Sequence, residues 1–186
     1  MAQTLPTAAV PVVITTQMLE QAAQLACTFH RPFWTGNSGE QSTGEAVARH
    51  LETASGLLNS FGWTRTWTMS TASLAPADDN ATTETMLRQL LDYLREEGSA
   101  SGPVTAVTAL GRTVGTAYGD PDTRDIAQAI LDLLIQALTG SSTARFSPWS
   151  ERLHRVPADI RILFTAGALF ARTYGPGTPG FERTAA

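Results

Sequence analysis

The segment from Asp120 to Gly140 limits the possible folds most strongly. Asp120 can cap a helix, Pro121 suits the first helical turn, and Asp122 places an acid at the positive end of the helix dipole. Gly140 can end the same helix. Between these signals, apolar residues recur every three or four positions: Ile126, Ile130, Leu133, Leu134 and Leu138. This spacing predicts an amphipathic helix whose apolar stripe must pack against other helices.

Five more segments show helical spacing, so we expect a mainly α protein, a compact bundle of about six helices. Ser42 and Glu45 have the spacing of a capping box, and Gly62 can end the helix that they open. In another helix, which Gly98 can end, five apolar residues are expected to point inward: Met86, Leu87, Leu90, Leu91 and Leu94. The predicted helices cover about residues 16–30, 42–61, 83–97, 103–118, 121–139 and 157–174.

A small β element is expected around Trp63–Met69. The apolar and polar residues alternate there, which places Trp63, Arg65, Trp67 and Met69 on one face and three threonines on the other. Residues 8–15 are rich in β-branched side chains, and Pro11 restricts them to an edge position. We therefore expect an N-terminal arm or edge strand at 1–15, one helical domain at 16–174 and a flexible tail at 175–186.

The chain length and its single cysteine indicate one domain in a reducing compartment. A chain of 186 residues with 42% hydrophobic content can build one core. Cys27 has no second cysteine to pair with, and we expect it to be a small core residue in a cytoplasmic protein. No apolar run reaches the length of a membrane span, so no membrane partner is predicted.

The charge distribution argues against nucleic-acid binding. The net charge is -4, whereas non-specific binding to phosphates depends on many cations. Residues 141–186 are nevertheless locally basic, with six arginines against three acids. All 13 basic residues are arginine, which favours a high-GC genome, such as that of an actinobacterium or of its phage or plasmid.

The basic region provides the best candidate for an interaction surface. Arginine forks match carboxylate and phosphate geometry, so this cluster could meet an acidic protein partner. The residues concerned are Arg145, Trp149, Arg152, Arg155 and Arg161. The alternative, a solvated face near a helix end, is the one that we favour.

The tryptophan strand is a candidate ligand site. Trp63 and Trp67 with Arg65 between them could stack on a planar ligand, and His50 could join such a pocket. We favour the alternative that the two indoles seal the helical core, because half-buried strands commonly show this alternation.

Gly111, Gly115 and Gly119 are four residues apart, and on one helix they would form a smooth groove for a neighbouring helix. The surrounding polar residues favour packing within a water-soluble protein. A phosphate-binding loop is excluded because a Walker motif requires a lysine.

No motif points to catalysis, a metal or a cofactor. Cys27 and His30 share one helix face, but a zinc site needs three or four ligands at recognisable spacing. Asp120, Asp122 and Asp125 could chelate a cation, although helix capping already explains two of them. We therefore predict no metal and no cofactor, and leave enzymatic activity undecided, with a non-catalytic role favoured.

The order of several features resembles a family of small actinobacterial proteins, domain of unknown function 6197. These features are Gly62-Trp63 after a helix, Ala109-Leu110-Gly111, a Leu-rich helix through Leu138, Trp149-Ser150-Glu151, and a last helix that opens near Arg155. The resemblance covers about residues 45–172 and implies a helical domain, with no assigned activity. Where the family tends to have Trp-Asn-Asp this chain has Trp-Ser-Glu, and the cysteine often found before the Leu-Gly pair has no counterpart in 106–109.

Together these features predict a non-catalytic interaction or regulatory protein that meets a protein partner or a second copy of itself. Such a protein should expose an apolar or basic patch and needs no deep cavity. The alternative is a small-ligand-binding or enzyme domain with a pocket near Trp63 and Trp67, which requires a concave site with convergent polar groups.

Overall fold

The computed structural model describes residues 12–30, 32–66, 81–99 and 102–178, and it is mainly helical. Its helices are α1 (Thr16–Cys27), α2 (Gly44–Phe61), α3 (Thr83–Ser99), α4 (Ala106–Thr113), α5 (Pro121–Thr139), α6 (Phe146–Ser150) and α7 (Pro157–Tyr174). The prediction of a mainly α fold is confirmed. The short helix α6 was not predicted, and it accounts for the difference from six.

The described part of the chain contains no sheet. Trp63 forms an isolated parallel bridge with Val104, and Thr35 forms an antiparallel bridge with Gln41. A strand was predicted at Trp63–Met69. In the described part of this segment, only Trp63 pairs with another chain segment, through its bridge to Val104. Trp67 and Met69 lie outside the described residues, as does most of the predicted N-terminal arm.

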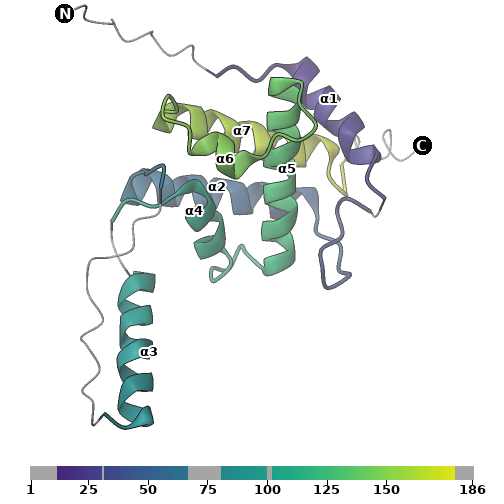
Figure 1. Cartoon of the computed structure of the whole chain (residues 1–186). Coiled ribbons are helices and arrows are strands. Elements are labelled where there is room, and N and C mark those ends of the chain that lie inside the picture. The colour runs from purple at the N-terminus through teal and green to yellow at the C-terminus, as the bar shows by residue number, and fades with distance from the viewer. Residues whose placement is uncertain (1–11, 31, 67–80, 100–101, 179–186) are drawn as a thin grey trace, which may run out of the picture.

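Three long helices form the centre of the body. The helix α5 runs across α2 and α7, which pack along each other (Figure 1). The helices α1 and α6 pack on α5, and α4 packs on α2. The four largest completely buried side chains come from α6 and α7, and they are Phe146, Trp149, Phe164 and Phe170. The predicted stripe of α5 is buried except for Leu138, which is partly buried against the same core.

Most helix ends follow from capping chemistry. Asp120 caps α5 by accepting a hydrogen bond from the backbone N–H of Thr123 at 2.8 Å, and Gly140 ends the helix with a φ of 68°. Gly62 ends α2 with a φ of 83°, as predicted. At the start of α2, however, Thr43 is the capping residue, and the Ser42 hydroxyl instead contacts that of Thr123.

Two predicted helices are shorter than expected. The helix α1 ends at Cys27, whose side chain is exposed, so its prediction as a core residue is wrong. Leu19, Ala22 and Ala23 are the buried residues of α1, and Cys27 lies beyond this face in the last turn. The helix α4 ends at Thr113 and does not continue to Tyr118.

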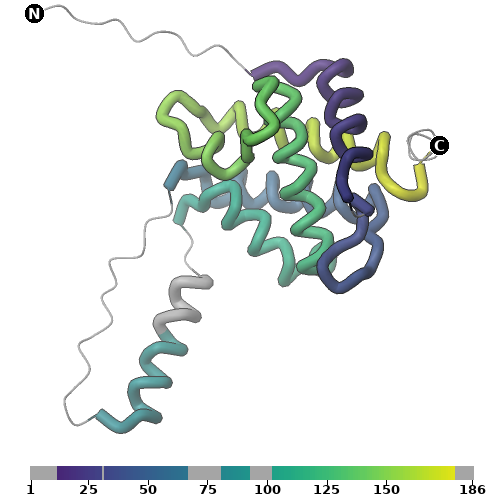
Figure 2. The backbone as a smooth tube through the Cα atoms, turned by 45° about the vertical axis from the view of Figure 1, so that its right-hand side comes forward, coloured from purple at the N-terminus to yellow at the C-terminus, as the bar shows by residue number. Residues whose placement is uncertain are grey.

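The helix α3 stands apart from the other helices in two views of the molecule (Figures 1 and 2). The chain that carries it leaves the body at the C-terminal end of α2. Within the described residues, no helix combines the length and the apolar character that a membrane span requires.

Candidate functional site

The chain from Thr64 to Pro103, here called the arm, carries α3 and has a paired root. The Thr64 N–H donates to the Val104 carbonyl at 3.0 Å, and the Val104 N–H donates to the Gly62 carbonyl at 3.0 Å. The arm therefore leaves and rejoins the body at one point. Because Val104 is buried, this root is part of the body's core.

The apolar stripe of α3 faces solvent. Met86 and Leu90 are each 41% exposed, Leu91 is 50% exposed and Leu87 is 55% exposed. The prediction that these residues point inward is wrong, because the helix is amphipathic but none of the other described helices covers its apolar side. The fifth predicted member, Leu94, has a side chain outside the described set. Large apolar residues grouped on one exposed face mark sites of protein contact.

The outer face of α7 is the second exposed apolar surface. A groove of about 510 Å³ runs along it. Its lining consists of Ile14, Ala158, Arg161, Ile162, Thr165, Ala166 and Leu169, and we call it the α7 groove. Leu169 is 53% exposed and Ile162 is 37% exposed. Sequence reasoning missed both residues, although α7 is apolar around much of its circumference, which signals contacts on two sides.

The two surfaces hold half of the exposed large apolar side chains of the described residues. Four of the twelve lie on α3, and two, Ile162 and Leu169, line the α7 groove. The other six are Val13, Phe29, Val107, Tyr118, Leu153 and Val156. The grouping distinguishes these two surfaces from the scattered apolar residues that any protein exposes.

The structure divides the predicted arginine cluster between the surface and the interior. Arg145, Arg152 and Arg161 are exposed, whereas Trp149 is 2% exposed. Arg145 donates to the carbonyls of Ser142 and Ala144, so it is tied to its own loop. A continuous surface of all five residues is not present.

Arg155 is the half-buried arginine of this cluster. Its guanidinium carbon lies 3.9 Å from the centre of the Trp149 ring, which is a close cation–π contact. Asp159 lies 3.9 Å from the same guanidinium and accepts a hydrogen bond from the backbone N–H of Val156. The arginine therefore seals the junction between α6 and α7, and burial lowers its pKa.

The residues of the predicted ligand pocket are placed in different surroundings. Trp63 is half-buried at the arm root, and Arg65 donates through Nε and Nη2 to the Arg155 carbonyl at 3.3 Å. His50 is completely buried on α2, with Nε2 3.1 Å from the Leu110 carbonyl. Trp67 lies outside the described residues. Arg65 thus connects the two predicted sites through a backbone contact.

The three glycines do not share a helix. Gly111 belongs to α4, whereas Gly115 and Gly119 follow it, because the helix ends at Thr113. The prediction of one glycine-lined helix groove is therefore wrong. A Cβ on Gly119 would lie 2.2 Å from the Thr113 carbonyl oxygen, so this glycine allows the chain to turn back against the end of α4.

The carboxylates at the start of α5 hold the loop that follows α1. Asp125 accepts from the Asn37 amide at 2.7 Å, and the Asp122 carboxylate accepts from both the hydroxyl and the backbone N–H of Ser38. The contact with Ser38 lowers the pKa of Asp122. No group of side chains suited to a metal is found among the described residues.

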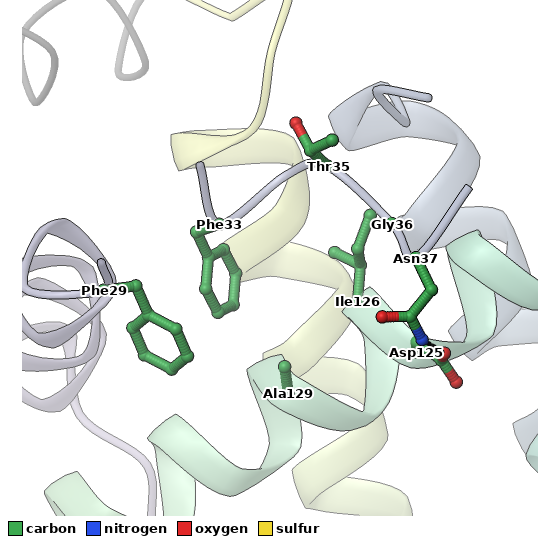
Figure 3. A pocket seen from close by; sticks show the side chains of 8 residues that line it. All are labelled: Phe29, Phe33, Thr35, Gly36, Asn37, Asp125, Ile126 and Ala129. Carbon is green, nitrogen blue, oxygen red and sulfur yellow. Dashed lines mark hydrogen bonds between the residues drawn. The ribbon is translucent and has the colours of Figure 1, made fainter. Parts of the chain in front are cut away.

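A cavity of about 50 Å³ lies beside this loop (Figure 3). Phe29 and Phe33 form one side of it, with ring centroids 5.2 Å apart, and Asn37 and Asp125 form the other. Its volume corresponds to roughly one or two water molecules. This space is too small for an organic substrate.

Arg172 joins α7 to α2 through two glutamates. Its Nε donates to Glu45 at 2.8 Å, and its Nη2 donates to Glu52 at 3.0 Å. The hydrogen bonds that Glu45 accepts from Arg172 and from Arg49 lower its pKa to about 2. Beside Glu45, a surface hollow of about 380 Å³ is lined by Arg49 and Tyr118, which form a cation–π pair at 5.9 Å.

The model of a family described as a family of unknown function, DUF6197, matches residues 42–169. The chain belongs to this family. No curated protein and no solved structure gives a significant match. In this DUF6197 chain, the match begins just before α2 and ends within α7, so it includes the arm and most of the α7 groove. The resemblance seen in the sequence, over about residues 45–172, is confirmed.

Proposed function

We propose that this DUF6197 chain is a protein-interaction module whose contact element is α3. The observation that carries the proposal is the row of four half-exposed apolar side chains on a helix that stands apart from the body. A grouped apolar face of this kind marks a contact site. The arm root supports the proposal, because it holds both ends of the arm at one buried point and leaves α3 free to meet another molecule.

The energetics of α3 favour a partner. The helix α3 has 17 residues, only slightly more than the roughly 12–15 below which an isolated helix is marginally stable in water, and helices in proteins owe most of their stability to packing. Covering the exposed part of four large apolar side chains contributes on the order of 1 kcal/mol each. Binding would therefore stabilise α3 as well as attach the partner.

The ligand-binding alternative has less support. The Arg65 guanidinium donates its hydrogen bonds to the Arg155 carbonyl. His50 is completely buried and has no exposed surface that a ligand could contact. The geometry thus supports a contact role more than a pocket at the tryptophan segment.

The test compares the wild type with Leu87→Gln/Leu91→Gln, which removes the apolar stripe while keeping good helix formers. Both serve as bait in an extract of the cells that make the protein, and captured proteins are purified and their binding is measured directly. Val107→Gln is the matched control, because Val107 is exposed on α4 outside both surfaces.

We expect a purified partner, or a second copy of the chain, to bind the wild type and the Val107 variant and to lose binding at least tenfold with the stripe variant. The proposal is wrong if binding to every partner, including a second copy, is the same for the stripe variant and the wild type.

A further inference from the structure

We infer that a second copy of this chain is the partner, and that α3 of each copy lies in the α7 groove of the other. This inference rests on the proposed function of α3. The resulting assembly is a reciprocal dimer with two identical α3–groove contacts, which is the closed arrangement typical of small oligomers.

The chemistry of the two surfaces is complementary. The groove is lined mainly by aliphatic and small side chains, and α3 presents methionine and leucine. Ala158, Thr165 and Ala166 are small, so a second helix can approach closely between the larger Ile162 and Leu169. The lining residues of α7 follow one another at helical spacing and form a stripe parallel to the helix axis.

The lengths of the two elements also match. The groove extends along α7 from Ala158 to Leu169, which corresponds to roughly 17 Å at 1.5 Å per residue. The helix α3 spans Thr83–Ser99, or roughly 25 Å. One α3 helix can therefore fill the groove and extend slightly beyond it.

Charge favours the same pairing. The residues of α3 include four acids and two arginines: Glu84, Asp92, Glu96, Glu97, Arg88 and Arg95. Arg161 is the charged residue of the groove lining, is exposed, and has no ion-pair partner among the described residues. An acidic helix against a basic groove is attractive, whereas two α3 helices paired with each other would bring two acidic elements together.

The placement of the two surfaces favours exchange between copies. Ile14 borders the groove and belongs to the segment leading into α1, whereas α3 stands apart from the other helices and leaves the groove uncovered (Figures 1 and 2). A groove that the chain's own α3 does not fill can be covered by α3 of a second copy.

The experiment is light scattering after size-exclusion chromatography on three purified proteins and one mixture. The proteins are the wild type, the stripe variant Leu87→Gln/Leu91→Gln, and a groove variant, Ile162→Gln/Leu169→Gln. The fourth sample mixes the stripe and groove variants in equal amounts. Circular dichroism shows whether each variant is folded, and Val107→Gln again serves as the control.

We expect the wild type and the control to have twice the chain mass of 19.8 kDa, and each double variant alone to fall to the single-chain mass. The mixture should recover a dimer, because the stripe variant keeps an intact groove and the groove variant keeps an intact α3. This recovery requires contact between unlike surfaces.

Two results would overturn the inference. If the wild type is a monomer at about 100 µM, which is well above the Kd range of specific complexes, a second copy is not the partner. If the groove variant remains a dimer while the stripe variant does not, α3 meets something other than the groove. In both cases the proposed function of α3 is still decided by the capture and binding experiment above, so the two failures can be told apart.

Discussion

His50 is a titratable residue placed entirely inside the body. Its Nε2 contacts the Leu110 carbonyl, and its Nδ1 has no hydrogen-bond partner within the described part of the chain. Burial lowers its pKa from the ordinary value of 6.5. Because the unfolded chain then binds a proton more readily than the folded one, the free energy of unfolding should decrease as the pH falls below about 6.5.

The decrease should not exceed about 1.4 kcal/mol per pH unit for this one proton. It can be measured as the change in the urea midpoint between pH 7.5 and pH 5.5. In His50→Gln, whose amide can still donate to the Leu110 carbonyl and does not titrate, the change should be smaller. An equal change in both proteins would show that His50 is not its source.

The residue type alone did not predict which of two side chains is buried. Trp149 near several arginines was predicted as part of a surface, yet it is buried because Arg155 covers its ring. Cys27 was predicted as a core residue but lies on the exposed side of the last turn of α1. Neither position can be derived from spacing alone, because both depend on which other helix is adjacent.

The contact between the start of α2 and the end of α7 is an element-scale feature with a testable consequence. A Cβ on Gly44 would lie 2.2 Å from the Ala171 carbonyl oxygen and 3.0 Å from the Gly175 Cα. The obstacles are backbone atoms, so Gly44→Ala should lower the free energy of unfolding by about 1–3 kcal/mol. Urea unfolding measures this change.

Gly56 is the matched control, because it lies in the same helix and an added Cβ would meet nothing within 4 Å. Gly56→Ala should raise the free energy of unfolding by about 0.5–1 kcal/mol, since alanine is the better helix former. Equal effects of the two substitutions would contradict the close approach of α2 and α7.

The elements themselves were largely predictable, whereas what covers them was not. The start and end of α5 follow from Asp120, Pro121 and Gly140. The stripe on α3 correctly predicted an amphipathic helix, but the same stripe is expected for a helix that packs on its own body and for one that packs on a partner. The groove on α7 was not predicted, because the apolar residues on the buried face of α7 were enough to predict a helix there.

For the whole molecule, the arm should be dispensable for folding of the body. The buried apolar residues of the described core include none between Leu58 and Val104. Replacing residues 67–101 with a four-residue Gly/Asn linker should therefore change the free energy of unfolding by less than about 1 kcal/mol, because loop-closure entropy depends only weakly on length. A loss of several kcal/mol would show that the arm belongs to the core.

The bridge between Trp63 and Val104 has a consequence for how members of this family can diverge. When both ends of a loop are fixed, each doubling of its length lowers the free energy of unfolding by only about 0.6 kcal/mol. Selection on the stability of the body therefore leaves the arm almost free to lengthen, shorten or change its sequence, while the residues that bracket it must stay. The arm can therefore change independently of the core, and a new binding specificity can arise while the core residues stay the same.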